Sequence, residues 1–168
     1  FDPLKLRAIN AAYIRALPAE EFRRLADPFI DSAVHCDIDR DLLCANLQPR
    51  CEVLEDIPPQ LDFFDAVLPI DAEMYRNKKQ KTTPESAKEA LTALLPVLEA
   101  QTDWTRDAIF EACKTLAEQM EKKNGWLLFP LGIALSGKAR TPGGGTDLAA
   151  MMGREETLKR VKDALGKL

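Results

Sequence analysis

The sequence has few β-branched aliphatic residues. Its 168 residues include only 5 Val and 8 Ile, against 23 Leu and 22 Ala. Leu and Ala favour helices, whereas Val and Ile favour strands. A chain of this length can also bury a sizeable hydrophobic core. We therefore predict an all-α fold, a helical bundle or cage of two small subdomains.

The sequence also has little histidine and lacks the cysteine spacings typical of zinc sites. The only histidine is His35, and no zinc-binding spacing occurs among the four cysteines, which are Cys36, Cys44, Cys51 and Cys113. One histidine gives little scope for a nucleophile–histidine–acid arrangement, so we expect no catalytic residue. We also expect no metal site, and we expect the cysteines to be buried core thiols.

Targeting signals are missing from the sequence as well. We find no signal peptide, transmembrane run or lipidation motif, which favours a cytoplasmic protein without membrane contact. Because the sequence starts at Phe1 and not at Met, we expect it to be a piece of a longer protein.

Positive charge is in deficit overall but unevenly distributed. The formal net charge is −4, yet residues 121–168 carry nine Lys or Arg against five Asp or Glu. The first 120 residues accordingly have a net charge of −8. A basic end on an acidic body can steer a polyanion to one region. Ordinary solvated helix faces are an equally simple explanation of the same charges.

Prolines and one polar stretch divide the chain. Asp2-Pro3 and Asp39 are typical helix starts, and Pro28 is expected to break or kink a helix. The stretch NKKQKTT at residues 77–83 is predicted to be a linker between subdomains at 1–76 and 84–168. In the second subdomain, we expect Thr102 or Asp103 to cap a helix that ends at Asn124-Gly125.

Residues 127–168 contain the most informative pattern. An apolar helix with Ala-Leu-Ser-Gly precedes a Thr-Pro-Gly turn, a short helix ending at Gly153, and a basic amphipathic helix. This order resembles the C-terminal, anticodon-reading end of bacterial-type glutamyl-tRNA synthetases. Further segments match that family in the same order: Phe1-Asp2-Pro3-Leu4-Lys5-Leu6, Leu47-Gln48-Pro49-Arg50, Phe63-Phe64, Thr102-Asp103-Trp104-Thr105, Pro130-Leu131 and Gly153-Arg154-Glu155-Glu156.

The resemblance implies a helical domain that receives the anticodon loop of glutamate tRNA. Residues 1–76 would be the stem-contact and anticodon-side subdomain, and residues 84–168 the C-terminal anticodon-binding subdomain. The parent ligase attaches glutamate to tRNA with ATP and Mg in a catalytic domain marked by His-Ile-Gly-His and Lys-Met-Ser-Lys-Ser. Neither signature occurs here. We expect a catalytically silent monomer without its own cofactor, which binds tRNA and not DNA.

The resemblance gives Arg50 the role of reading the last anticodon base. Glutamate anticodons end in C and glutamine anticodons in G. A guanidinium only donates hydrogen bonds, so it suits the acceptors of cytosine and opposes the donors of guanine. The alternative is a surface arginine paired to Glu52 or Glu55.

The Thr141-Pro142-Gly143 turn is the second predicted base contact. The proline ring offers a flat apolar surface, and the glycines let backbone amides approach RNA closely. Four cations are predicted to contact phosphates: Lys138, Arg140, Lys159 and Arg160. The alternative is a mobile glycine loop that only joins two helices.

One position departs from the family pattern. Members commonly carry arginine directly after the Pro-Leu that Pro130-Leu131 matches, and this chain has Gly132. The sequence leaves open how that arginine is replaced and whether the parent also charges glutamine tRNA. A helical protein-interaction scaffold without an RNA role is the rival class of function.

Overall fold

The computed structural model describes residues 2–168, so that Phe1 of the matched N-terminal segment lies outside the described residues. The chain divides into two compact units, Phe1–Ala66 and Val67–Leu168. Residues 2–168 contain no strand, only one isolated antiparallel bridge between Asn77 and Thr82. The predicted all-α fold is confirmed.

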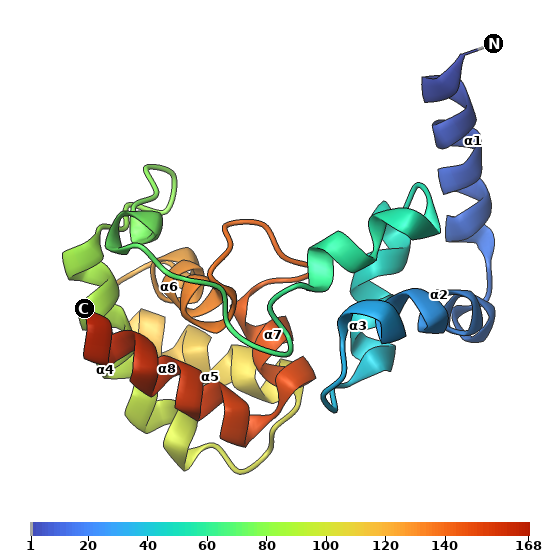
Figure 1. Cartoon of the computed structure of the whole chain (residues 1–168). Coiled ribbons are helices and arrows are strands. Elements are labelled where there is room, and N and C mark those ends of the chain that lie inside the picture. The colour runs from blue at the N-terminus through green and yellow to red at the C-terminus, as the bar shows by residue number, and fades with distance from the viewer. Residues whose placement is uncertain (1) are drawn as a thin grey trace. The chain divides into compact units, whose positions relative to one another are not determined.

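The first unit contains three α-helices and three short 3-10 helices. They are α1 (Pro3–Ala16), α2 (Ala19–Ala33), α3 (Arg40–Leu47), η1 (Gln48–Arg50), η2 (Leu54–Asp56) and η3 (Pro58–Leu61). Helix α2 packs against α3, η2 and η3 (Figure 1). Its apolar face is fully buried and consists of Phe22, Ala26 and Ile30.

Two helix starts in the first unit follow the predicted caps. An Asp2 carboxylate oxygen accepts the Leu4 amide at 3.1 Å, and an Asp39 carboxylate oxygen accepts the Leu42 amide at 3.0 Å. A break or a kink is expected at Pro28; helix α2 continues through it, so the break does not occur. Burial of an apolar face on both sides of the proline compensates for the backbone hydrogen bond that the proline cannot make.

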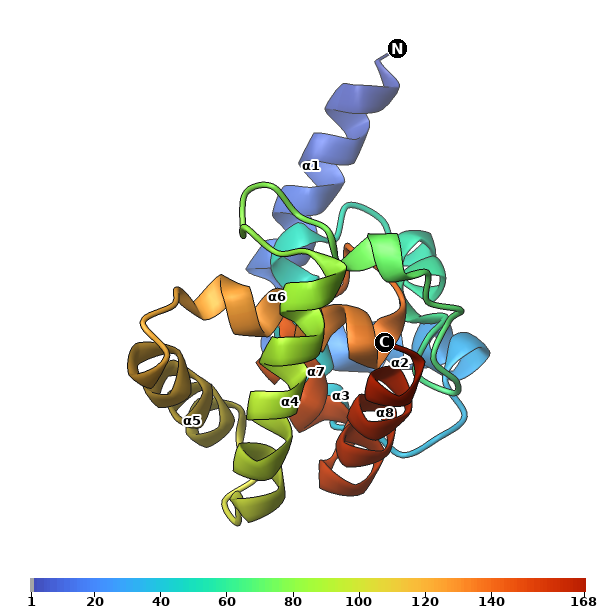
Figure 2. The same ribbon diagram turned by 90° about the vertical axis from the view of Figure 1, so that its left-hand side faces the viewer.

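The second unit is arranged around one apolar helix. Its elements are η4 (Ala72–Tyr75), α4 (Pro84–Ala100), α5 (Arg106–Gln119), α6 (Asn124–Ser136), α7 (Gly145–Met152) and α8 (Arg154–Lys167). Helix α6 contacts α4, α5, α7 and α8 (Figure 1 and Figure 2). A helix that is apolar on every side has to be enclosed in this way.

The predicted linker at residues 77–83 lies inside the second unit. The chain divides ten residues earlier, between Ala66 and Val67, because η4 precedes the linker and packs on α4 and α6. The linker itself is a closed turn in which Asn77 and Thr82 exchange two backbone hydrogen bonds, at 3.1 and 3.0 Å. Thr83 then caps α4, with its hydroxyl accepting the Ser86 amide at 3.0 Å.

The boundaries of α5 also differ from the sequence prediction. Thr105 caps this helix, with its hydroxyl accepting the Ala108 amide at 3.3 Å, instead of Thr102 or Asp103. Helix α5 ends at Gln119, and Asn124-Gly125 begins α6 instead of ending α5. The apolar run from Trp126 extends the next helix backwards to these two residues.

The cysteines are mostly core residues. Cys44, Cys51 and Cys113 are buried as predicted, and burial raises the thiol pKa to about 11 at the first two and about 12 at Cys113. Cys36 is exposed, and there the prediction is wrong. It lies after the end of α2, outside any helix, where no helical face buries it.

Among residues 2–168, no helix combines the length and apolar character needed to cross a bilayer. In the same range, no group of three or more His, Cys, Asp or Glu side chains is placed to hold a metal ion.

Gly137→Ala is expected to lower the free energy of unfolding by about 2 kcal/mol or more. Gly137 ends α6 with φ +76°, and an added Cβ would lie 2.5 Å from the Leu68 carbonyl oxygen. The left-handed backbone alone costs a residue with a Cβ about 1–2 kcal/mol. Denaturant unfolding followed by circular dichroism measures the change.

Gly166→Ala in α8 is the matched control. An added Cβ there meets nothing within 4 Å. We expect it to be neutral or to raise the free energy of unfolding by about 0.5–1 kcal/mol. Similar effects of the two substitutions would contradict the assigned role of Gly137.

Candidate nucleic-acid interface

The loop between α6 and α7 is fixed by its own hydrogen bonds. The Ser136 hydroxyl donates to the Gly132 carbonyl at 2.6 Å and accepts the Lys138 amide at 3.0 Å. In the turn, the Thr141 hydroxyl donates to the Gly143 carbonyl at 2.7 Å, and the Gly143 amide donates to the Thr141 carbonyl at 2.9 Å. Gly143 has φ +109°, a conformation that favours glycine.

The next glycines serve the packing of the two helices. A Cβ on Gly145 would lie 2.9 Å from the Leu128 carbonyl oxygen and 3.1 Å from the Gly132 nitrogen. Helix α7 therefore begins in direct backbone contact with α6. The sequence suggested that these glycines let the backbone approach RNA closely. At Gly145, the close approach is instead between the backbones of α7 and α6.

The side chains of this loop differ in how accessible they are. Arg140 is exposed, and no hydrogen bond or ion pair of its side chain is found among residues 2–168. Lys138 and Thr141 are half-buried. Pro142 is buried, so little of its ring can stack on a base. We therefore do not retain the stacking role predicted for Pro142.

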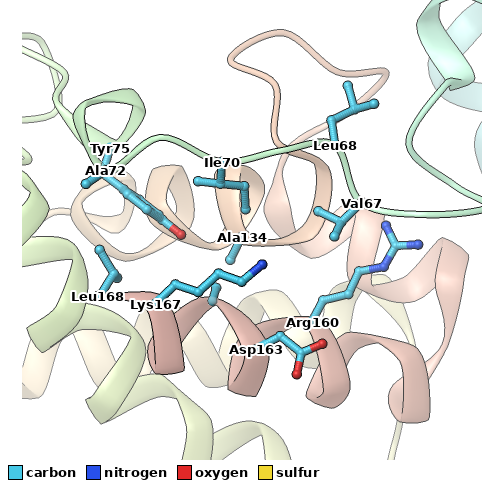
Figure 3. Close-up of a pocket in the computed structure, with 11 residues that line it drawn as sticks. Val67, Leu68, Ile70, Ala72, Tyr75, Ala134, Arg160, Asp163, Lys167 and Leu168 are labelled. Carbon is cyan, nitrogen blue, oxygen red and sulfur yellow. The ribbon is translucent and has the colours of Figure 1, made fainter.

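Arg160 has a structural role instead of the predicted phosphate contact. Its side chain is only 3% exposed. Its Nε donates to a Glu156 carboxylate oxygen at 2.9 Å, and its Nη1 donates to the Leu135 carbonyl at 2.7 Å. The bond to Leu135 ties α8 to α6, and the bond to Glu156 lies within α8. Figure 3 shows Arg160 at one end of a pocket lined mainly by apolar side chains, which suits no phosphate.

The outer face of α8 does present cations. Lys159 is exposed, and no ion pair of its ammonium group is found in the described part of the chain. Lys162 lies 3.9 Å from a Glu99 carboxylate, and Arg154 donates to the Glu99 carbonyl. Lys159 is thus better suited to a phosphate than its two neighbours.

Arg50 stands at the end of η1 in the first unit and is exposed. The turn that carries it is anchored, because the Gln48 side-chain amide donates to the Ile14 and Leu17 carbonyls at 2.9 Å each. Glu52, one of the two expected partners, pairs with Arg7 at 2.7 Å. Among residues 2–168, no ion pair or hydrogen bond of the Arg50 side chain is found.

Sequence reasoning missed three residues that fix α7. The Trp104 indole donates to the Ala149 carbonyl at 2.9 Å. Arg106 Nε donates to an Asp147 carboxylate oxygen at 3.0 Å, and the other oxygen accepts the Gly144 amide at 3.0 Å. Asp147 could have been found as an acidic residue in the first turn of a helix. Arg106 is 41 residues away, and no local pattern connects the two.

The predicted site residues therefore fall into two groups. Arg50 belongs to the first unit, and the other seven belong to the second, five of them on the loop at residues 138–143. Arg50, Arg140 and Lys159 are exposed hydrogen-bond donors. Within each unit, an exposed donor of this kind can bind the acceptors of phosphates and bases.

Comparison with known proteins gives the family. The sequence model for the anticodon binding domain matches residues 10–165. The chain belongs to this anticodon-binding domain family. The family resemblance inferred from the sequence is confirmed.

The relatives are glutamate–tRNA ligases. The chain is 44% identical over 168 residues to that of Clostridium botulinum (strain Hall), which covers all of this chain and 35% of the relative. The Clostridium tetani protein is 41% identical over 168 residues, covering all of this chain and 34% of the relative. The chain thus spans about a third of the length of these relatives.

A solved structure shares the fold. The crystal structure of a glutamate tRNA ligase from Elizabethkingia meningosepticum, in complex with its amino acid, matches with a TM-score of 0.83 at 24% identity. The match covers all of this chain and 33% of that one.

Arg160→Met is expected to lower the free energy of unfolding by about 1–3 kcal/mol, since it leaves a buried carbonyl without its donor. Lys159→Met, on the same helix, removes the same charge from an exposed position and should change stability by less than about 0.5 kcal/mol. Denaturant unfolding of both variants measures the difference. Equal stabilities would argue against a structural role for Arg160.

Proposed function

We propose that the chain binds the anticodon loop of a glutamate-accepting tRNA as the RNA-reading part of a glutamate–tRNA ligase. The family match over residues 10–165 carries this proposal, and identities of 38–44% to clostridial glutamate–tRNA ligases support it. ATP, Mg and the transfer of glutamate belong to the rest of such a ligase. The proposal places the protein in the cytoplasm as a monomer.

Arg50 is the proposed reader of the third anticodon base. Its exposed guanidinium carries five N–H donors and no acceptor. Cytosine offers O2 and N3 as acceptors on its pairing edge, whereas guanine has the N1–H and N2–H₂ donors at those places, beside the O6 acceptor. The guanidinium therefore stabilises a bound C and leaves a bound G facing like groups.

The phosphate contacts are assigned to three of the four predicted cations. Arg140 and Lys159 are exposed, and Lys138 lies at the start of the same loop as Arg140. These contacts position the RNA without specifying its sequence. Thr141 and Gly143 shape the turn that presents Arg140, and their backbone remains a candidate base contact.

A second candidate function is a protein-interaction scaffold. Helix α1 favours it, because four large apolar side chains of α1 are exposed, namely Leu4, Leu6, Ile9 and Tyr13. Apolar surface of this kind marks contacts with protein. Such binding would depend weakly on salt. RNA binding should weaken steeply as salt rises, because the release of counterions from the phosphates is then less favourable.

The test is the binding of the 168-residue chain to two anticodon stem-loops of glutamate tRNA, one with C and one with G at the third anticodon position. We expect the C loop to bind more tightly by about 1–3 kcal/mol, the value of one good base contact. Affinity should fall with rising salt. Equal affinity for both loops, or no salt dependence, would contradict the proposed function.

Arg50→Ala is expected to remove most of the C-over-G preference while the fold is retained. The reason is that Arg50 has no partner among residues 2–168 whose loss would disturb the first unit. Arg24→Ala is the matched control: it removes an exposed arginine of α2 that pairs with Glu21. A preference unchanged in the Arg50 variant, or lost equally in both, would rule out base reading by Arg50.

Gly132→Arg is expected to tighten RNA binding by about tenfold, the range of one hydrogen bond to a charged group. It restores the arginine common in the family. The first atom of a new side chain fits there, because an added Cβ would meet only the Gly145 nitrogen, at 3.9 Å. Gly166→Arg adds the same charge on α8 and serves as control. An equal gain from both would indicate general electrostatics.

A further inference from the structure

Asp147 connects three segments of the second unit. It occupies the first turn of α7, and its side chain is 15% exposed. One carboxylate oxygen accepts Arg106 Nε of α5, and the other accepts the Gly144 amide, each at 3.0 Å. Both oxygens are therefore engaged by donors from outside the body of α7.

Arg106 is itself held in place. Its guanidinium carbon lies 5.0 Å from the centre of the Phe110 ring, and Nη1 donates to an Asp107 carboxylate oxygen at 3.2 Å. The hydrogen bond to Asp107 is the largest cause that raises the pKa of Arg106, so the guanidinium stays charged. The ring limits where Nε can point, and Nε donates to Asp147.

The Gly144 amide, which donates to Asp147, directly follows the Thr141–Gly143 turn. The turn is closed by two hydrogen bonds between Thr141 and Gly143, but neither bond reaches another element. At its other end, the Lys138 amide is bound to Ser136 at the end of α6. The Gly144–Asp147–Arg106 connection joins the second end of the turn to α5.

We propose that Arg106 and Asp147 are positioning residues, which hold the Thr141–Gly143 turn and Arg140 in the orientation that meets RNA. This proposal depends on the proposed function, since it names the residues that shape that site. Neither residue needs to touch the RNA, because Arg106 Nε and both carboxylate oxygens are bonded within the protein.

The substitution Asp147→Asn distinguishes positioning from general electrostatics, because the two predict opposite changes in RNA affinity. The variant removes a negative charge near the RNA surface, so electrostatics alone predicts tighter binding. An asparagine oxygen can replace only one of the two acceptors, so positioning predicts weaker binding, by about fivefold or more. The probe is the C-ending anticodon stem-loop, with binding measured at fixed salt.

Asp107→Asn is the matched control. It makes the same change of charge on the neighbouring partner of Arg106, at a side chain that is 91% exposed and not bonded to the turn. We expect its binding to be equal to wild type or slightly tighter. Asp147→Gln is a second variant for the case that the asparagine variant unfolds, because glutamine at this position of a helix can still accept the backbone amide.

A double-mutant cycle with Arg140→Ala measures the coupling. If Asp147 orients Arg140, removing Arg140 should cost less affinity in the Asp147→Asn background than in wild type. Additive losses, or binding by a folded Asp147 variant that equals or exceeds wild type, would overturn the proposal. If the wild-type chain itself shows no C-over-G preference, or no salt dependence of RNA binding, the proposed function is refuted, and the positioning role with it.

Discussion

The enclosure of α6 is the constraint on which the second unit depends. This helix is apolar on all sides, and its buried residues include Leu127, Leu131, Ile133 and Leu135. Each buried side chain of this size contributes about 1.5–3 kcal/mol relative to exposure. Neighbouring helices must therefore cover every face of α6. Helix α7 covers one of them through backbone contact at Gly145. The position of the α6–α7 loop follows from that contact.

Internal pairing, and not the number of charges, removes several cations from the candidate RNA contacts. Arg7, Arg23, Arg40 and Arg160 each bond to carboxylates of the protein. Arg50, Arg140 and Lys159 are exposed and have no such partner among residues 2–168. A chain with a net charge of −4 can thus still present donors to a polyanion at chosen places.

The sequence predicted the fold class and several helix starts, because these depend on local composition and on capping residues such as Asp2 and Asp39. Boundaries set by tertiary packing were missed. Pro28 lies inside α2, since its apolar neighbours are buried. Of the predicted site residues, Arg160 shows the limit best: a basic residue of an amphipathic helix suggests a solvent contact, and only the fold reveals that its guanidinium bonds a buried carbonyl of α6.

The Thr-Pro-Gly-Gly-Gly run carries two physical demands within five residues. Gly145 is required for the close approach of α7 to α6, whereas Gly143 provides a left-handed turn that closes on Thr141. Asp147 joins these demands, since it lies in the first turn of α7 and accepts the Gly144 amide that follows the turn. Packing and recognition are therefore separable by residue. Gly145 serves the packing of α7 on α6, Arg140 is the proposed RNA contact, and the Asp147–Arg106 salt bridge connects the turn beside Arg140 to α5.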